Sequence, residues 1–228
     1  MKHAGKATQA ALRLIYWPLF FVLALMLVSV LAKFLGSILI YVAGGLAVLW
    51  VLFGLFCLYF FRDPNPAIPS APEAILAPAH GKVDTIDEIE ELEFMGGRCR
   101  RVSIFMSVLD VHVQRAPVSG RIAFHKRAAG QFLNALRTDS AAFNENVLLG
   151  FLSAERDGER VAVRLIAGAI ARRIVVWADG GTKVARGERI SLIQFGSRCD
   201  LLLPLDVRIK VQLGQSVRAG ETVVANRP

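Results

Sequence analysis

The chain has 228 residues, of which 54% are hydrophobic and 20% are charged, and its mean hydropathy is +0.46. This composition is too apolar for an ordinary soluble domain, and it excludes a disordered or low-complexity chain. The net charge of +8 is unevenly spread: residues 1–61 hold four basic residues and no acidic one, and the other 23 basic and 19 acidic residues give 62–228 a charge of +4. An excess this small favours an anionic lipid surface or headgroup and argues against a nucleic-acid partner.

The N-terminal part predicts a membrane anchor. Residues 14–32 carry no charge, and after Lys33 the chain carries none again until Arg62. Because about 20 apolar residues cross a bilayer core, we expect a two-helix hairpin with helices at about 14–32 and 36–61. Basic residues flank the hairpin on both sides, so the positive-inside rule places both ends in the cytoplasm. We therefore expect residues 1–61 to hold the protein in the cell (inner) membrane, with the rest facing the cytoplasm.

The remainder of the chain predicts a linker and one mainly β domain. Residues 62–78 contain five prolines and are expected to be an extended linker. From residue 79 to 228, short β runs alternate with glycine turns, which indicates a compact β-sandwich or barrel, similar to a barrel-sandwich domain. Only Phe132–Asn146 reads as a helical or irregular interlude. The expected strands are Val83–Ile86, Val102–Met106, Gly120–Phe124, Val161–Ile166, Ile174–Trp177, Ile190–Phe195, Leu201–Leu203 and Val207–Val211.

Four motifs in a fixed order carry a family resemblance. They are YFFRDP at 59–64, PAHGKV at 78–83, MSVLDVHVQRAP at 106–117 and IQFGSR at 193–198. With these motifs the chain resembles the phosphatidylserine decarboxylase family, most closely its short form, over essentially its whole length. The resemblance implies a decarboxylase that converts phosphatidylserine to phosphatidylethanolamine. Phosphatidylserine in the membrane is then the expected partner.

The same resemblance implies that the chain cuts itself between Gly196 and Ser197. The products are a β chain of residues 1–196 and an α chain of residues 197–228, which stay together as a heterodimer; a homo-oligomer is left open. An N-to-O acyl shift onto the Ser197 hydroxyl, β-elimination and hydrolysis would leave a pyruvoyl group at Ser197. Its ketone would form a Schiff base with the substrate amine and accept electrons as carbon dioxide leaves, so we expect neither a metal nor pyridoxal phosphate.

Two histidines are the candidate proton-transfer groups. His112 matches the Asp-x-His segment of the family, which implies a role in decarboxylation. His80 stands where many members carry the aspartate of a processing triad, and Arg115 stands where longer members carry a second histidine. A neutral imidazole can accept a hydroxyl proton without a carboxylate, so we expect His80 to act as the processing base toward Ser197.

Arginines are the expected ligands of the headgroup. Arg115, Arg172 and Arg173 are candidates, because the planar guanidinium fits a carboxylate or phosphodiester through two hydrogen bonds. Neighbouring residues on a strand face opposite sides, so Arg172 and Arg173 cannot both point into one pocket. Two alternatives stay open at this point: a non-enzymatic, membrane-anchored β-barrel adaptor or carrier-like module, and a homologue that does not process itself.

Overall fold

The computed structural model describes residues 6–131, 143–168, 173–194 and 197–228, with side chains from residue 16 onward. The chain divides into two compact units at the bond between Cys57 and Leu58. The first unit is helical. The second unit, Leu58–Pro228, contains all of the described strands and the last three residues of the helix.

The predicted two-helix hairpin is wrong, because the apolar region forms one continuous helix, α1, from Lys6 to Phe60. The expected turn contains Gly36 as its only weak helix former, and a single glycine costs a helix only about 1 kcal/mol. The Ser37 hydroxyl also donates to the carbonyl of Lys33 at 3.0 Å, inside the helix. The portion Tyr16–Phe60 is long and apolar enough to cross a membrane.

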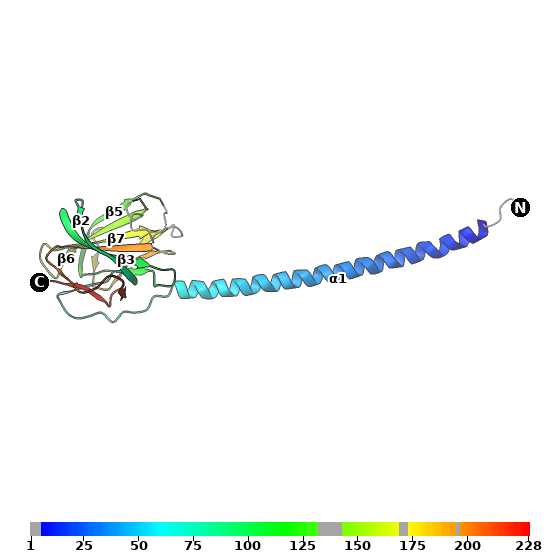
Figure 1. The fold of residues 1–228 in the computed structure, drawn as a ribbon, viewed down its shortest axis with the longest axis horizontal. Helices are drawn as coiled ribbons and strands as arrows, with labels where there is room; N and C mark the ends of the chain where they lie inside the picture. Colours follow the sequence, from blue (N-terminus) through cyan, green and yellow to red (C-terminus); the bar gives the residue numbers. More distant parts are fainter. Residues whose placement is uncertain (1–5, 132–142, 169–172, 195–196) are drawn as a thin grey trace. The chain divides into compact units, whose positions relative to one another are not determined.

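The second unit is mainly β, as predicted, and its main sheet is a half-barrel of antiparallel strands (Figure 1). The strands are ordered β13-β2-β3-β11-β7-β6-β5-β9, so within the described residues the sheet has two edges and is not a closed barrel. Their bounds are β2 Gly81–Glu91, β3 Gly97–Met106, β5 Gly120–Ala128, β6 Asn146–Ser153, β7 Arg160–Ala167, β9 Lys183–Val184, β11 Ser197–Leu203 and β13 Ser216–Val217.

Two three-stranded antiparallel sheets complete the unit, with the orders β1-β14-β12 and β4-β10-β8. The strands of the first are β1 Ala74–Leu76, β12 Arg208–Ile209 and β14 Val223–Asn226; those of the second are β4 Val113–Arg115, β8 Ile174–Val176 and β10 Arg189–Ile193. One apolar core joins all three sheets, since it contains Ile75, Val224 and Ile190 together with Ile104 and Leu201 of the large sheet.

Strand β11 lies in the middle of the large sheet and is buried along its whole length. Because side chains alternate along a strand, one face of β11 carries Cys199 and Leu201 into the main core. The opposite face carries Leu202 into a second, smaller cluster with Phe94. The two faces of β11 are therefore buried in different surroundings, which matters for Ser197 at its start.

Each strand expected from the sequence overlaps an observed one. The interlude expected at Phe132–Asn146 falls mostly outside the described residues, and β6 begins at its last residue. Residues 62–78, expected as a linker, lie along the β unit. The guanidinium of Arg186 donates to the carbonyls of Pro69, Ala71 and Ala74 at 2.6–3.1 Å.

Candidate functional site

Ser197 is the first residue of β11 and has no exposed surface. It is held on both sides, because its backbone pairs with Met106 of β3 and with Ala167 of β7. Its hydroxyl lies 3.3 Å from the sulfur of Met106. The hydroxyl therefore lies in a dry setting beside a thioether, on the same face of the strand as the main core.

The chain crosses between two sheets immediately before Ser197. Strand β10, in a three-stranded sheet, ends at Ile193, whose N–H donates to the carbonyl of His112 at 3.2 Å. The next residue, Gln194, donates its N–H to the carbonyl of Arg173 at 3.2 Å. The predicted cleavage bond lies at this crossing into the large sheet; Gly196 itself lies outside the described residues.

Gln114 links the two sides of this crossing. Its side chain has no exposed surface, and its Nε2 donates to the carbonyl of His112 at 2.7 Å and lies 3.7 Å from the sulfur of Met106. Its Oε1 accepts from the hydroxyl of Ser191 on β10 at 2.8 Å. A buried amide with both ends occupied holds its neighbours in fixed positions. Gln114 and Ser191 were not predicted from the sequence. The position of Gln114 between two buried residues of the motif at 106–117 could have indicated a buried amide.

Asn144 supports the other neighbour of Ser197. It is almost completely buried, and its Nδ2 donates at 2.7 Å to the carbonyl of Ala167, the residue of β7 that pairs with Ser197. The residue type alone does not reveal this role, because an asparagine in a loop is usually a turn former. Its contact depends on a strand that is distant in sequence.

His112 is fully buried and lies in the loop between β3 and β4. Its Nδ1 lies 2.9 Å from the carbonyl oxygen of Asp110. Because a carbonyl oxygen can only accept, Nδ1 carries the proton of the neutral ring, and Nε2 carries the lone pair. Burial lowers the pKa of His112 to about 4, although the Asp110 carbonyl and carboxylate act in the opposite direction. The ring is therefore neutral at pH 7, as a proton acceptor requires.

Asp110 shapes the loop that carries His112. Its Oδ2 accepts from the backbone N–H of Ser107 at 2.8 Å and from the Ser107 hydroxyl at 2.7 Å. Its own N–H donates to the carbonyl of Ser107 at 3.0 Å, which closes a tight turn. The carboxylate thus fixes the backbone of the loop, and its negative charge also acts on both His112 and His80.

His80 has the opposite tautomer. The N–H of Ala219 donates to its Nδ1 at 3.3 Å, so Nε2 carries the proton of the neutral ring. Burial lowers the pKa of His80, while the charges of Asp110 and Glu221 counteract part of this shift. The neighbouring Gly81 has φ +147°, and a Cβ there would lie 2.1 Å from the carbonyl oxygen of Phe105, so only glycine lets β2 start this close to β3.

A cavity of about 390 Å³ opens beside His80. Asp110 and Ser107 line it on one side, and the cationic side chains of Lys82 and Arg218 also line it. His80, Asp110 and the two cationic side chains therefore surround the same cavity. The full lining is His80, Gly81, Lys82, Phe105, Ser107, Asp110, Ser216, Val217 and Arg218.

The three arginines expected at the headgroup have different surroundings. Arg115 is buried, and its guanidinium donates to Asp63 at 2.6 Å and to the carbonyls of Pro64 and Gly187 at 3.0 Å. It does not line the cavity beside His80. Arg173 is exposed and touches the crossing through its backbone. Arg172 lies outside the described residues.

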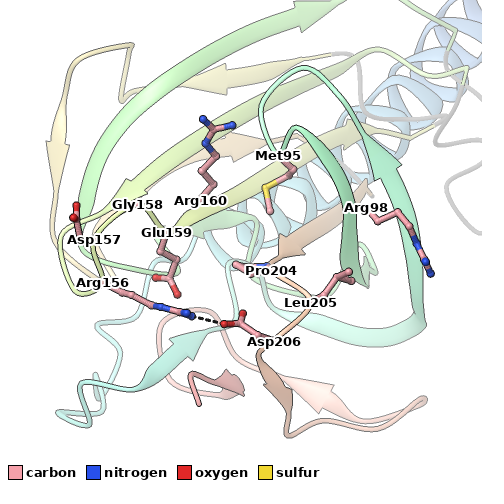
Figure 2. A pocket seen from close by; sticks show the side chains of 10 residues that line it. All are labelled: Met95, Arg98, Arg156, Asp157, Gly158, Glu159, Arg160, Pro204, Leu205 and Asp206. Carbon is pink, nitrogen blue, oxygen red and sulfur yellow. Dashed lines mark ion pairs between the residues drawn. The ribbon is translucent and has the colours of Figure 1, made fainter.

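A larger cavity, of about 630 Å³, lies at the other end of the large sheet (Figure 2). Arg98, which lines it, is near the start of β3, whereas Met106 is at the end of that strand. At about 3.3 Å per residue the two ends are roughly 25 Å apart. Its charged groups are partly neutralised, as Arg156 and Asp206 form an ion pair at 2.7 Å across it. This cavity is therefore separate from Ser197.

Comparisons with known proteins agree with the family resemblance. The model of the family described as "Phosphatidylserine decarboxylase" matches residues 53–225. A phosphatidylserine decarboxylase proenzyme of Symbiobacterium thermophilum is 42% identical over 212 residues, which are 93% of this chain and 94% of that protein. The proenzyme of Desulfotalea psychrophila is 40% identical over 78% of this chain and 83% of its own length. That of Geobacter sulfurreducens is 44% identical over 76% of this chain and 78% of its own length.

Proposed function

The chain belongs to the phosphatidylserine decarboxylase family, and we propose that its activity depends on a pyruvoyl group that the chain makes from its own Ser197. The reaction removes the serine carboxylate of phosphatidylserine as carbon dioxide and leaves phosphatidylethanolamine. The observation that carries the proposal is the placement of Ser197, which is buried at the start of a central strand where the chain crosses between two sheets.

The surroundings of Ser197 suit a pyruvoyl group. Conversion replaces the amine and hydroxyl of the serine with a ketone and a methyl group. The hydroxyl now lies against the Met106 sulfur, and a thioether is as good a neighbour for a methyl group as for a hydroxyl. Conversion removes the nitrogen of residue 197, so the pairing of the rest of β11 with β3 and β7 would keep the new N-terminus in place.

His112 suits the role of the proton acceptor. The pyruvoyl ketone supplies an electrophile that captures the substrate amine and withdraws electrons as the carboxylate leaves. The chain itself must move protons at this centre. Nε2 of the neutral His112 carries a lone pair at pH 7, because burial keeps the pKa low and the Asp110 carbonyl holds the proton on Nδ1.

His80 suits the role of a hydrogen-bond donor during processing. Its Nδ1 lone pair accepts from Ala219, so the ring presents an N–H at Nε2. A donor of this kind stabilises a developing oxyanion, and removal of one such donor typically costs about 10²–10³-fold in rate. The motif position suggests a processing base, and the rates of self-cleavage of His80→Gln and His80→Ala distinguish the two roles.

The cavity beside His80 is the proposed headgroup site. Lys82 and Arg218 line it and supply two positive charges for the phosphodiester. Arg115 contributes indirectly, since its donors hold Asp63 and the neighbouring backbone. We further infer that α1 anchors the protein in the cell membrane. The cytoplasmic side expected for the β unit followed from a two-helix hairpin, and the structure has one continuous helix in its place.

The test uses the purified full-length chain in mixed micelles. Carboxyl-labelled phosphatidylserine should release labelled carbon dioxide, and labelled free serine should release far less. Denaturing electrophoresis with intact mass should give chains of 196 and 32 residues, the shorter one with a ketone at its N-terminus. Ser197→Ala should remain one chain and release no carbon dioxide.

Three results would contradict the proposal. Cleavage of Ser197→Ala at the same bond would exclude the acyl shift. Activity that survives hydroxylamine, or borohydride with substrate, would exclude the ketone. Faster release of carbon dioxide from free serine than from phosphatidylserine would exclude the lipid as the preferred substrate.

A further inference from the structure

The YFFRDP motif at 59–64 is a part of the chain to which the reaction assigns no role. It contains the last residues of α1 and the turn that follows, and it belongs to the same compact unit as the site. A segment that only joined an anchor to a domain would need no specific side-chain contacts. This one makes contacts from nearly every side chain, and several of them reach the loop that carries His112.

Two side chains of the motif hold one carbonyl of that loop. The hydroxyl of Tyr59 donates to the carbonyl of Leu109 at 3.3 Å, and Nη2 of Arg62 donates to the same oxygen at 2.7 Å. Nη1 of Arg62 also donates to the carbonyl of Tyr59 at 2.8 Å, and its guanidinium lies 3.9 Å from the centre of the Tyr59 ring. Leu109 immediately precedes Asp110, whose own carbonyl holds Nδ1 of His112.

Phe60 touches the histidine itself. Its side chain has no exposed surface, and its ring centre lies 4.2 Å from that of His112, with 31° between the ring planes. A phenyl ring at this distance covers one face of the imidazole and keeps water from it. The burial that lowers the pKa of His112 therefore includes a residue of the anchor helix.

The chain after the helix is fixed as well. Asp63 forms ion pairs with Arg115 of β4 and with Arg189 of β10. Arg115 also donates to the carbonyl of Pro64 at 3.0 Å. Because β4 follows His112 directly and β10 leads to the cleavage bond, the motif is tied to both strands that approach the site.

We propose that Phe60 is a positioning residue for His112, and that Tyr59 and Arg62 hold the Leu109–His112 loop so that the end of the membrane helix forms one wall of the active site. This rests on the proposed role of His112 in decarboxylation. Phe60 fixes the imidazole plane and excludes water from it, while the Asp110 carbonyl fixes its tautomer. The charged and titratable groups that act on His112 include Asp110, Arg62 and His80, and a substitution at Phe60 changes none of these.

The experiment compares Phe60→Ala, Phe60→Leu and the control Leu58→Ala in the full-length protein. Leu58 is on the same helical turn and is 76% exposed, so its loss should change nothing at the site. Rates are measured in mixed micelles with phosphatidylserine between pH 5 and 9. They are divided by the amount of α chain that carries a ketone, so that incomplete processing does not affect kcat.

We expect Phe60→Ala to lower kcat by about 10-fold, with KM changed by less than about 2-fold, because proton transfer by a misplaced acceptor is impaired. Exposure to water should also move the acidic midpoint of the pH–rate profile upward by roughly one pH unit, toward the ordinary histidine value. Phe60→Leu keeps apolar cover and should restore the wild-type midpoint. A purely structural role for Phe60 would lower the amount of folded enzyme without moving this midpoint.

A Phe60→Ala enzyme with the wild-type kcat and midpoint would overturn the proposal, as would a loss confined to folded yield. If Phe60→Ala gives no folded protein, Tyr59→Phe decides: removal of one hydrogen bond to Leu109 should lower kcat by about 2- to 10-fold, and an unchanged kcat would count against the proposal. Failure of the proposed function is recognised separately, since the wild type would then release no carbon dioxide or His112→Gln would keep full activity.

Discussion

Arg198 and Asp84 form an ion pair that reaches across strand β3. Nη1 and Nη2 of Arg198 donate to the two carboxylate oxygens of Asp84 at 2.9 and 2.5 Å. Asp84 lies where the register of β2 against β3 shifts, between Val83 and Thr85, so a bulge directs its side chain. Arg198 directly follows Ser197. The pair therefore fixes the start of β11 from the face opposite to the one that Ser197 occupies.

We predict that Asp84→Asn destabilises the β unit and slows self-cleavage. Only 2% of the Arg198 side chain is exposed, and removal of the carboxylate leaves its charge in a dry setting. The free energy of unfolding should fall by on the order of 3 kcal/mol. Chemical denaturation in detergent measures the stability, and electrophoresis over time measures cleavage.

Asp87→Asn is the matched control. Asp87 also lies on β2 and pairs through both oxygens with an arginine, Arg101, at 2.9 and 2.6 Å. This pair is more exposed than Arg198–Asp84, since 22% of the Arg101 side chain and 40% of the Asp87 side chain are exposed. It also lies farther from Ser197. Its loss should cost less than about 1 kcal/mol and should leave cleavage unchanged. Equal effects of the two variants would show that Arg198 is not specifically held.

The role of His80 in self-cleavage can be tested through its tautomer, which places the proton of the neutral ring on Nε2. His80→Gln retains an N–H donor but cannot take a proton, whereas His80→Ala retains neither. If His80 donates a hydrogen bond, His80→Gln should cleave itself much faster than His80→Ala. If His80 is instead a general base, the rate of self-cleavage should fall in both variants by the ~10²–10⁴-fold that is typical for loss of such a group. The half-time of cleavage after synthesis measures the difference.

The strands were predictable where short apolar runs lie between turn residues. Every expected β run overlaps a strand, although only Val207–Val211 alternates strictly between apolar and polar residues. Strand β6 was not expected. Its sequence, NVLLGFLS, is a short apolar run interrupted by a glycine, and such a run does not by itself distinguish a strand from a buried helix. The short strands β1, β4 and β13 gain their pairing from neighbours distant in sequence, which no local pattern indicates.

The helical hairpin was predicted from length, and length does not encode a turn. A single Lys33 and Gly36 do not interrupt a helix, and no proline follows Pro18 until Pro64.

The candidate site could be predicted from the sequence only in part. The motifs indicate Ser197, His112 and His80, whose catalytic roles stay predictions. The contacts of Phe60, Gln114 and Asn144 come from residues brought together by the fold, and residue type alone gave no sign of them.

The boundary between the two compact units predicts where the chain can be shortened. A chain that starts at Leu58 should keep the stability of the full-length protein, because the compact unit begins there. A chain that starts at Asp63 lacks the buried ring of Phe60 and the Arg62 contacts, and its free energy of unfolding should fall by about 3 kcal/mol or more. Urea unfolding followed by circular dichroism compares the two. Equal stability would mean that the end of α1 contributes little to the fold.

The low pKa of His112 predicts a loss of stability in acid. Burial lowers this pKa from 6.5 to about 4, so between these values the unfolded chain binds a proton that the folded chain does not. Stability should therefore be unaffected by this group above about pH 6.5 and should fall as the pH drops through the window toward 4. The full effect is about 3 kcal/mol, at 1.36 kcal/mol per pKa unit.

His112→Gln isolates this contribution. Other groups, including His80, titrate in both proteins, so the difference between the two curves of unfolding free energy against pH reports His112 alone. We expect the variant to have a flatter curve between pH 4 and 6.5, whatever its stability at pH 7. Parallel curves for the variant and the wild type would mean that His112 titrates at its ordinary pKa. The imidazole would then be partly charged near pH 6, and burial would not be what keeps it neutral for proton transfer.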